Sequence, residues 1–219
     1  YESWTSARIV PSNMALPVLL YVPNLIGYLR VVLALAGYYY ALADHRVTVG
    51  CYFVSQILDA ADGYAARKLG QSSSFGAVLD MVTDRASTTC LCIVLGRLYP
   101  DLVFTFTCLV MLDMFSHWYQ MYATLKMGLG SHKDVTNPIL RFYYWKPVLF
   151  LSCAGTELWY MAMYVSHFDP NPLVGTALLV ALPVCAFKQV ANVVQLVVAA
   201  NTIVEHDQQL ADAASRKAS

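Results

Sequence analysis

The chain has 219 residues, of which 58% are hydrophobic and 13% charged, and its formal net charge is zero. A soluble domain carries about 25% charged residues, so this composition predicts an integral membrane protein. The zero net charge gives no general attraction for nucleic acid. The six cysteines show no paired metal-ligand spacing, which argues against a zinc site and against a disulfide framework.

The apolar stretches predict six transmembrane helices, because about 20 apolar residues are needed to cross a bilayer. In chain order, we expect spans at 22–42, 47–66, 74–97, 101–125, 146–167 and 172–204. The predicted fold is therefore an all-α polytopic membrane domain over residues 22–204, preceded by an interfacial N-terminal segment, 1–21. The polar C-terminal tail, 205–219, is expected to be either a helix end or disordered. Six spans place both termini on the same side.

Basic residues concentrate on one side of this predicted topology. The connections on the side of the termini hold Arg67, Lys68 and several further lysines and arginines, whereas the opposite side holds only Arg46 and Arg97. By the positive-inside rule, the side of the termini is cytoplasmic. The segment 67–73 and the loop 126–145 therefore face the cytoplasm in this interpretation.

Four aspartates at helical spacing stand in the second and third predicted spans. Asp59 and Asp62 share one face near the cytoplasmic end of the second span, and Asp80 and Asp84 stack with Gly76 on one face of the third. Carboxylates inside a membrane are costly and usually mark an ion or catalytic site. Two antiparallel helices would bring these four side chains to one depth.

Four carboxylates in a low-dielectric site require neutralisation. Mg²⁺ and Mn²⁺ prefer oxygen ligands, and ions bound in this way commonly contact phosphates. We therefore predict that the four aspartates hold a divalent cation and that Arg67 adds a phosphate contact. The alternative is that these are helix-end carboxylates paired with Arg67, Lys68 and Arg85 without a metal.

This spacing of residues resembles the signature of the CDP-alcohol phosphotransferase family. The positions that carry the resemblance are Asp59, Asp62, Gly63, Ala66, Arg67, Gly76, Asp80 and Asp84. The wider chain is similar to eukaryotic members that use inositol, in the stretches 22–30, 79–85, 116–118, 137–144 and 153–160. The likeness covers residues 20–205 and leaves out the N-terminal extension and the far tail.

The resemblance implies a six-helix membrane enzyme, usually a homodimer, with a cytoplasm-facing cavity and a location in the endoplasmic reticulum. It implies transfer of a phosphatidyl group from CDP-diacylglycerol to myo-inositol, with release of CMP. Mg²⁺ or Mn²⁺ on the four aspartates would bind the diphosphate, and Asp84 would be the general base that takes the acceptor proton. Gly63, Ala66, Arg67 and Gly76 would shape the CDP-diacylglycerol site.

Further polar side chains lie at similar depth in other predicted spans. Asp113 and His117 share a face of the fourth span, and Glu157 lies in the fifth. We expect that Asp113, His117, Glu157 and Arg85 include hydrogen-bond partners of the acceptor, and their carboxylates favour an uncharged polyol. The alternative is structural. Arg85 would only neutralise Asp113, and the polar side chains would pair with each other across helices, namely Arg30, Asp113, His117 and Glu157.

Two more residues each allow several interpretations. Asn24, near the start of the first span, either caps that helix or lines the nucleotide cleft. Lys188, in the sixth span, could contact a lipid phosphate or a partner subunit, snorkel to the surface, or form a buried pair.

The sequence leaves two alternative functions. Within the same reaction class, the acceptor could be serine, glycerol 3-phosphate or inositol phosphate, although a phosphorylated acceptor would require a basic pocket. Intramembrane carboxylates also occur in ion-coupled transporters. Transporters commonly carry internal repeats, and this chain has no evident repeat.

Overall fold

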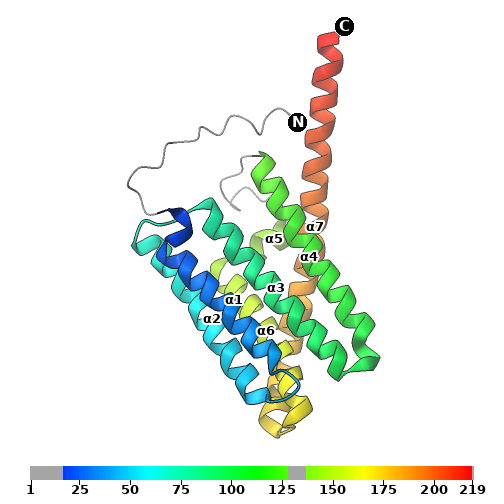
Figure 1. The fold of residues 1–219 in the computed structure, drawn as a ribbon. Coiled ribbons are helices and arrows are strands. Elements are labelled where there is room, and N and C mark those ends of the chain that lie inside the picture. The colour runs from blue at the N-terminus through cyan, green and yellow to red at the C-terminus, as the bar shows by residue number, and fades with distance from the viewer. Residues whose placement is uncertain (1–16, 128–136, 219) are drawn as a thin grey trace. The chain divides into compact units, whose positions relative to one another are not determined.

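The computed structural model describes residues 17–127 and 137–218. Within these ranges every regular element is a helix (Figure 1), so the predicted all-α class is confirmed. In chain order the elements are η2 (Val18–Leu20), α1 (Val22–Tyr39), α2 (His45–Lys68), α3 (Ser74–Leu98), η3 (Pro100–Leu102), α4 (Val103–Met127), α5 (Pro138–Tyr143), α6 (Lys146–Phe168) and α7 (Pro172–Ala218).

The predicted spans match the long helices closely, with one exception at the C-terminus. The sixth span begins at Pro172 as predicted, but α7 continues through the polar tail to Ala218, over 47 residues. Of the two alternatives for the tail, the helix is therefore correct as far as Ala218. The short helix α5, in the connection between α4 and α6, was not predicted.

Four helical stretches of the described residues are long and apolar enough to cross a membrane. They are Val22–Tyr39, Pro100–Lys126, Lys146–Phe168 and Pro172–Arg216. The helices α2 and α3 have 24 and 25 residues, which at about 1.5 Å per residue is enough for a hydrocarbon layer of about 30 Å. Both carry the charges of the aspartate motif, and their passage through the membrane stays a prediction.

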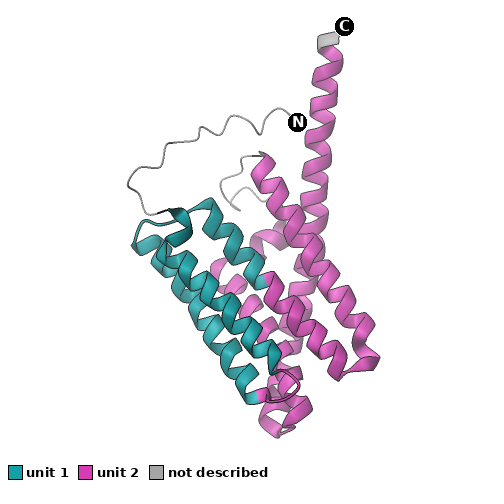
Figure 2. Cartoon of the chain, in the orientation of Figure 1, with its two compact units in different colours: residues 1–40, 46–84 teal, residues 41–45, 85–219 magenta. Residues whose placement is uncertain are grey.

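The chain divides into two compact units (Figure 2). Unit 1 comprises residues 1–40 and 46–84, and unit 2 comprises residues 41–45 and 85–219. The division falls within α3, between Asp84 and Arg85. Unit 1 therefore holds the complete aspartate motif.

In unit 1, two glycines allow the chain to turn and the helices to approach. Gly70 has a φ of 62°, the left-handed conformation that commonly follows a helix end, and α3 starts four residues later at Ser74. A β-carbon at Gly27 of α1 would lie 2.9 Å from Leu79 Cδ2 of α3. The absence of a side chain at Gly27 thus lets α1 lie close to α3.

In unit 2, the long helix α7 packs against α4 and α6, and α5 contacts both α6 and α7. Gly155 of α6 faces Val184 of α7 so closely that a β-carbon there would lie 2.5 Å from Val184 Cγ1. Near the far end of α7, Lys126 Nζ donates to Asp207 Oδ1 at 2.9 Å on the surface. This ion pair joins the last turn of α4 to the polar extension of α7.

Candidate functional site

A single guanidinium, that of Arg30 in α1, contacts all four aspartates of the motif. Its Nη1 lies 3.0 Å from Asp62 Oδ2 and 2.8 Å from Asp80 Oδ1. Its Nη2 lies 2.6 Å from Asp59 Oδ1 and also pairs with Asp84 Oδ1. The Arg30 side chain is 2% exposed, whereas that of Asp80 is 49% exposed. Three helices therefore bring one buried cation and four carboxylates together, and the meeting of the four carboxylates is what the helical spacing of the aspartates predicts.

The cation that pairs with the motif was not the one expected. The metal-free alternative assigned Arg67, Lys68 and Arg85 as partners of the aspartates, and the sequence linked Arg30 to polar groups of later spans. The structure instead pairs Arg30 with the motif aspartates, and Arg85 with Asp113. Helix periodicity shows which residues share a face, but it does not show which helix lies opposite that face.

The aspartate cluster has the donor set of a divalent cation site. One carboxylate oxygen from each of Asp59, Asp62 and Asp80 lies within 4.8 Å of the others. Mg²⁺ binds oxygen at about 2.0–2.1 Å in octahedral geometry, so neighbouring ligands are about 2.9 Å apart and opposed ligands about 4.2 Å, and the three carboxylates would have to move closer together around the ion. Asp84 contacts the same guanidinium. These hard oxygen donors fit Mg²⁺ or Mn²⁺.

A cleft in unit 1 adjoins this cluster. All five residues predicted to contact CDP-diacylglycerol line it, and so do two of the aspartates. These residues are Asn24, Gly63, Ala66, Arg67, Gly76, Asp62 and Asp80. Because the carboxylates open into the same cleft, a phosphate-containing ligand bound there would lie beside the predicted metal ligands.

Asn24 lines the cleft and does not cap α1. The N-cap of α1 is Tyr21, and Asn24 is buried inside the helix. Its Nδ2 donates to the Val18 carbonyl at 2.5 Å. Its Oδ1 lies 2.8 Å from the position that a β-carbon at Gly76 would take. The interpretation of Asn24 as the cap of α1 is wrong, and its contact with a nucleotide in the cleft stays a prediction.

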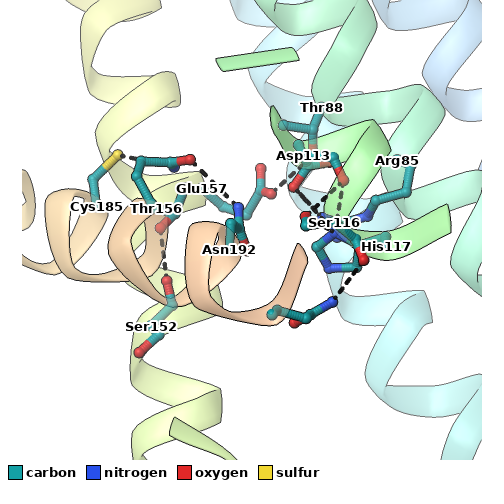
Figure 3. Close-up of polar contacts among 12 residues, drawn as sticks. Arg85, Thr88, Asp113, Ser116, His117, Ser152, Thr156, Glu157, Cys185 and Asn192 are labelled. Atoms are coloured by element: carbon teal, nitrogen blue, oxygen red, sulfur yellow. Dashed lines mark hydrogen bonds and ion pairs between the residues drawn. The ribbon is translucent and has the colours of Figure 1, made fainter. Parts of the chain in front are cut away.

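Unit 2 contains a second polar cluster, built from α3, α4 and α6 (Figure 3). Arg85 Nη1 donates to Asp113 Oδ1 at 2.7 Å, and His117 Nδ1 lies 2.8 Å from the Asp113 carbonyl oxygen. Thr88 Oγ1 donates to Glu157 Oε1 at 3.0 Å. Figure 3 shows that the predicted acceptor residues gather within this unit, together with Thr88, which the sequence analysis did not single out.

The helix α7 adds polar side chains that the sequence analysis also missed. Gln195 Nε2 donates to the Ser116 carbonyl at 3.2 Å, and Tyr144 OH donates to Gln195 Oε1 at 3.2 Å. Burial raises the pKa of Tyr144 to about 12, so this phenol stays protonated as a donor. Asn192, also on α7, is fully buried. Buried amides in an otherwise apolar span are the signal that could have identified them.

Within the described residues, two buried oxygens of this cluster have no hydrogen-bond partner, Asp113 Oδ2 and Asn192 Oδ1. Buried polar atoms are normally satisfied, and an oxygen without a partner suits a ligand that carries hydroxyl donors. Lys188 is also buried, with 1% of the residue exposed, so the interpretation that it snorkels to the surface is wrong.

Comparison with known proteins identifies relatives over most of the chain. The family model described as CDP-alcohol phosphatidyltransferase matches residues 20–204. CDP-diacylglycerol–inositol 3-phosphatidyltransferase from Homo sapiens is 41% identical, covering 91% of this chain and 98% of the relative. The Candida albicans protein of the same name is 46% identical, covering 89% and 85%, and that of Schizosaccharomyces pombe is 42% identical, covering 90% and 94%. No solved structure gives a significant match.

Proposed function

The chain belongs to the CDP-alcohol phosphatidyltransferase family, and we propose that it transfers the phosphatidyl group of CDP-diacylglycerol to myo-inositol. The products are phosphatidylinositol and CMP. Relatives named for this reaction match the chain at 41–46% identity. The structural observation that carries the proposal is the convergence of the four motif aspartates beside a cleft.

We assign the four aspartates as ligands of Mg²⁺ or Mn²⁺. A divalent cation bound there would supply positive charge that stabilises the negative charge that builds up on the phosphoryl oxygens during transfer. The support for this assignment is the donor set: carboxylate oxygens of Asp59, Asp62 and Asp80 within 4.8 Å of one another, with Asp84 held by the same guanidinium. The cleft beside them is where the diphosphate would bind.

Asp84 is the proposed general base. It accepts the proton of the attacking inositol hydroxyl while the inositol oxygen forms a bond to the phosphatidyl phosphorus. The bond from that phosphorus to the CMP oxygen breaks, and its electron pair leaves with CMP. The Asp84 side chain is 33% exposed, which supports access by a hydroxyl. A carboxylate beside cations is a weak base, so alignment of the hydroxyl is what makes the transfer efficient.

Arg67, Asn24 and the motif glycines form the proposed CDP-diacylglycerol site. Arg67 is an exposed residue of the cleft, and its Nη1 lies 3.4 Å from the position of a β-carbon at Gly63. A larger residue at 63 would therefore contact the guanidinium. Several N–H donors in one plane suit the oxygens of a phosphate, which supports Arg67 as the proposed contact of the diphosphate.

The cluster of Arg85, Asp113, His117 and Glu157 is the proposed acceptor site. The proposal is supported by the two carboxylates and the imidazole of this cluster, which can form hydrogen bonds with hydroxyl groups. The cluster has no excess of positive charge that would bind a phosphorylated acceptor. The buried Asp113 Oδ2, which has no hydrogen-bond partner among the described residues, adds a specific acceptor for a hydroxyl donor.

We further propose six membrane spans, a homodimer, and a location in the endoplasmic reticulum with the cleft facing the cytoplasm. The lengths of α2 and α3 and the basic residues near the aspartate motif support the topology. Cysteine-labelling reagents applied to sealed vesicles would test the sidedness, and native electrophoresis of cross-linked protein would test the dimer.

Incubation of the purified protein with CDP-diacylglycerol and a panel of labelled alcohols tests the reaction directly. The panel comprises myo-inositol, inositol phosphate, serine and glycerol 3-phosphate. We expect CMP and phosphatidylinositol in equal amounts with myo-inositol alone. Turnover with another alcohol instead would overturn the choice of acceptor and keep the reaction class. No CMP release with any alcohol would overturn the transferase assignment.

A further inference from the structure

Arg30 is the only described cation that reaches all four motif aspartates, and it does so from a buried position. Its two terminal nitrogens make the four ion pairs, two from each nitrogen. The third guanidinium nitrogen, Nε, is buried and has no hydrogen-bond partner within the described residues. The guanidinium is therefore fixed by the aspartates themselves.

With all four carboxylates ionised, the charges in this cluster do not balance without another cation. Four ionised carboxylates carry four negative charges, and Arg30 supplies one positive charge. Carboxylates at such distances repel each other unless a cation lies between them. The guanidinium of Arg30 lies within ion-pair distance of all four carboxylates.

The oxygens that Arg30 holds coincide with the predicted ligands of the metal. Asp59, Asp62 and Asp80 each contact Arg30, and each contributes an oxygen to the group that lies within 4.8 Å. A divalent cation among these oxygens would lie a few ångströms from a guanidinium of like charge. The two cations therefore compete for the same carboxylates.

We propose that Arg30 is a positioning residue that neutralises the four carboxylates and holds them together until a divalent cation, which competes with it for these oxygens, binds. When a divalent cation enters, Arg30 gives up part of its contacts. This rests on the proposed metal site. Because Nε has no hydrogen-bond partner in the described part of the chain, the known contacts of the guanidinium are those with the aspartates.

The positions of the aspartates relative to the cleft support an approach of the cation from the side away from Arg30. Asp62 and Asp80 line the cleft, as do Asn24 and Gly27. Arg30 lies three residues after Gly27 on the same face of α1, and it does not line the cleft. A cation would meet the carboxylates from the open cleft, while Arg30 holds them from the buried end.

Mn²⁺ binding by the full chain in detergent tests the proposal without any turnover. The metal-stripped protein is titrated with Mn²⁺ and the free ion is followed by electron paramagnetic resonance, with thermal unfolding measured in EDTA and in saturating Mn²⁺. Arg30→Gln removes the charge. Lys68→Gln is the matched control, since it removes a charge from unit 1 at a side chain that lies over the Tyr64 ring, 5.4 Å from its centroid.

We expect Arg30→Gln to bind Mn²⁺ at least about tenfold more tightly, because the repulsion between the cations is lost. In EDTA this variant should unfold at a lower temperature than the wild type. Saturating Mn²⁺ should remove this difference in unfolding temperature. Lys68→Gln should match the wild type in both measurements. Unchanged or weaker Mn²⁺ binding by a folded Arg30→Gln protein would overturn the proposal.

Arg30→Lys decides the question if the Gln variant does not fold. A lysine keeps the charge but cannot contact four carboxylates through a planar fork, so we expect Mn²⁺ binding that is tighter than in the wild type. Equal or weaker binding would again count against the role of Arg30. If the wild type itself binds no Mn²⁺, the proposed metal site is wrong as well. If the wild type binds Mn²⁺ but the Arg30 variants bind it no more tightly, only the proposed role of Arg30 is wrong.

Discussion

Asn24 Oδ1 lies beside Gly76 at 2.8 Å from the position that a β-carbon would take, so a side-chain oxygen of α1 fills the space beside α3 at the wall of the cleft. The position of Asn24 thus depends on a glycine of the motif. A real β-carbon does not approach an oxygen so closely, and any side chain at 76 would displace the amide.

Gly76→Ala should therefore weaken CDP-diacylglycerol binding. We expect the KM for CDP-diacylglycerol to rise by about tenfold, as for the loss of about 1.4 kcal/mol of binding free energy, with a smaller change in the KM for inositol. Gly50→Ala is the matched control in unit 1, because nothing lies within 4 Å of its added β-carbon. Equal kinetics for the two variants would show that the position of Asn24 does not matter.

Removal of divalent cations should abolish turnover. Four carboxylates around one arginine leave a net negative site that repels the diphosphate, and only added positive charge reverses this. We expect EDTA to stop CMP release and either Mg²⁺ or Mn²⁺ to restore it, while Asp80→Ala loses Mn²⁺ binding and activity together. Full activity in rigorously metal-free buffer would contradict the assignment.

Asp84→Asn should lower kcat by about 10²- to 10⁴-fold, the usual cost of removing a general base. The amide keeps the shape of the side chain but cannot accept the proton. Binding of CDP-diacylglycerol, measured separately, should change much less. Asp101→Asn, a change at an exposed residue of η3, serves as the control and should leave kcat unchanged. A near-normal rate for Asp84→Asn would place the base elsewhere.

Asp113→Asn should raise the KM for inositol far more than the KM for CDP-diacylglycerol. It weakens the pair with Arg85 and alters a buried acceptor, and loss of one buried hydrogen bond costs about 1–3 kcal/mol. Asp207→Asn is the control in the same unit, because it removes an exposed ion pair with Lys126. Equal effects of Asp113→Asn on both substrates would argue that Asp113 has only a structural role.

The sequence predicted the helices well because apolar length is a strong signal. Five of six expected spans coincide with α1, α2, α3, α4 and α6 to within a few residues. The end of α7 was left open between helix and disorder, since hydrophobicity marks where a helix leaves apolar surroundings and not where its backbone hydrogen bonds stop. Alanines and glutamines in the tail have good helix propensity.

The candidate site could be predicted only one helix at a time. The spacing of the aspartates predicted which of them share a face, and all four belong to unit 1. The partner of these faces depends on which helix packs against them, and periodicity contains no such information. Arg30 was therefore assigned to the wrong partners, and Asn192 and Gln195 were overlooked within an apolar span.

The length of α7 has a consequence for the surroundings of the protein. At about 1.5 Å per residue a helix of 47 residues measures about 70 Å, more than twice the thickness of the hydrocarbon layer of a bilayer. If its apolar part crosses the membrane, the segment after Glu205 extends into water as a continuous helix about 20 Å long. A fluorophore attached at Ser215 would then report distances to the lipid headgroups from a fixed height.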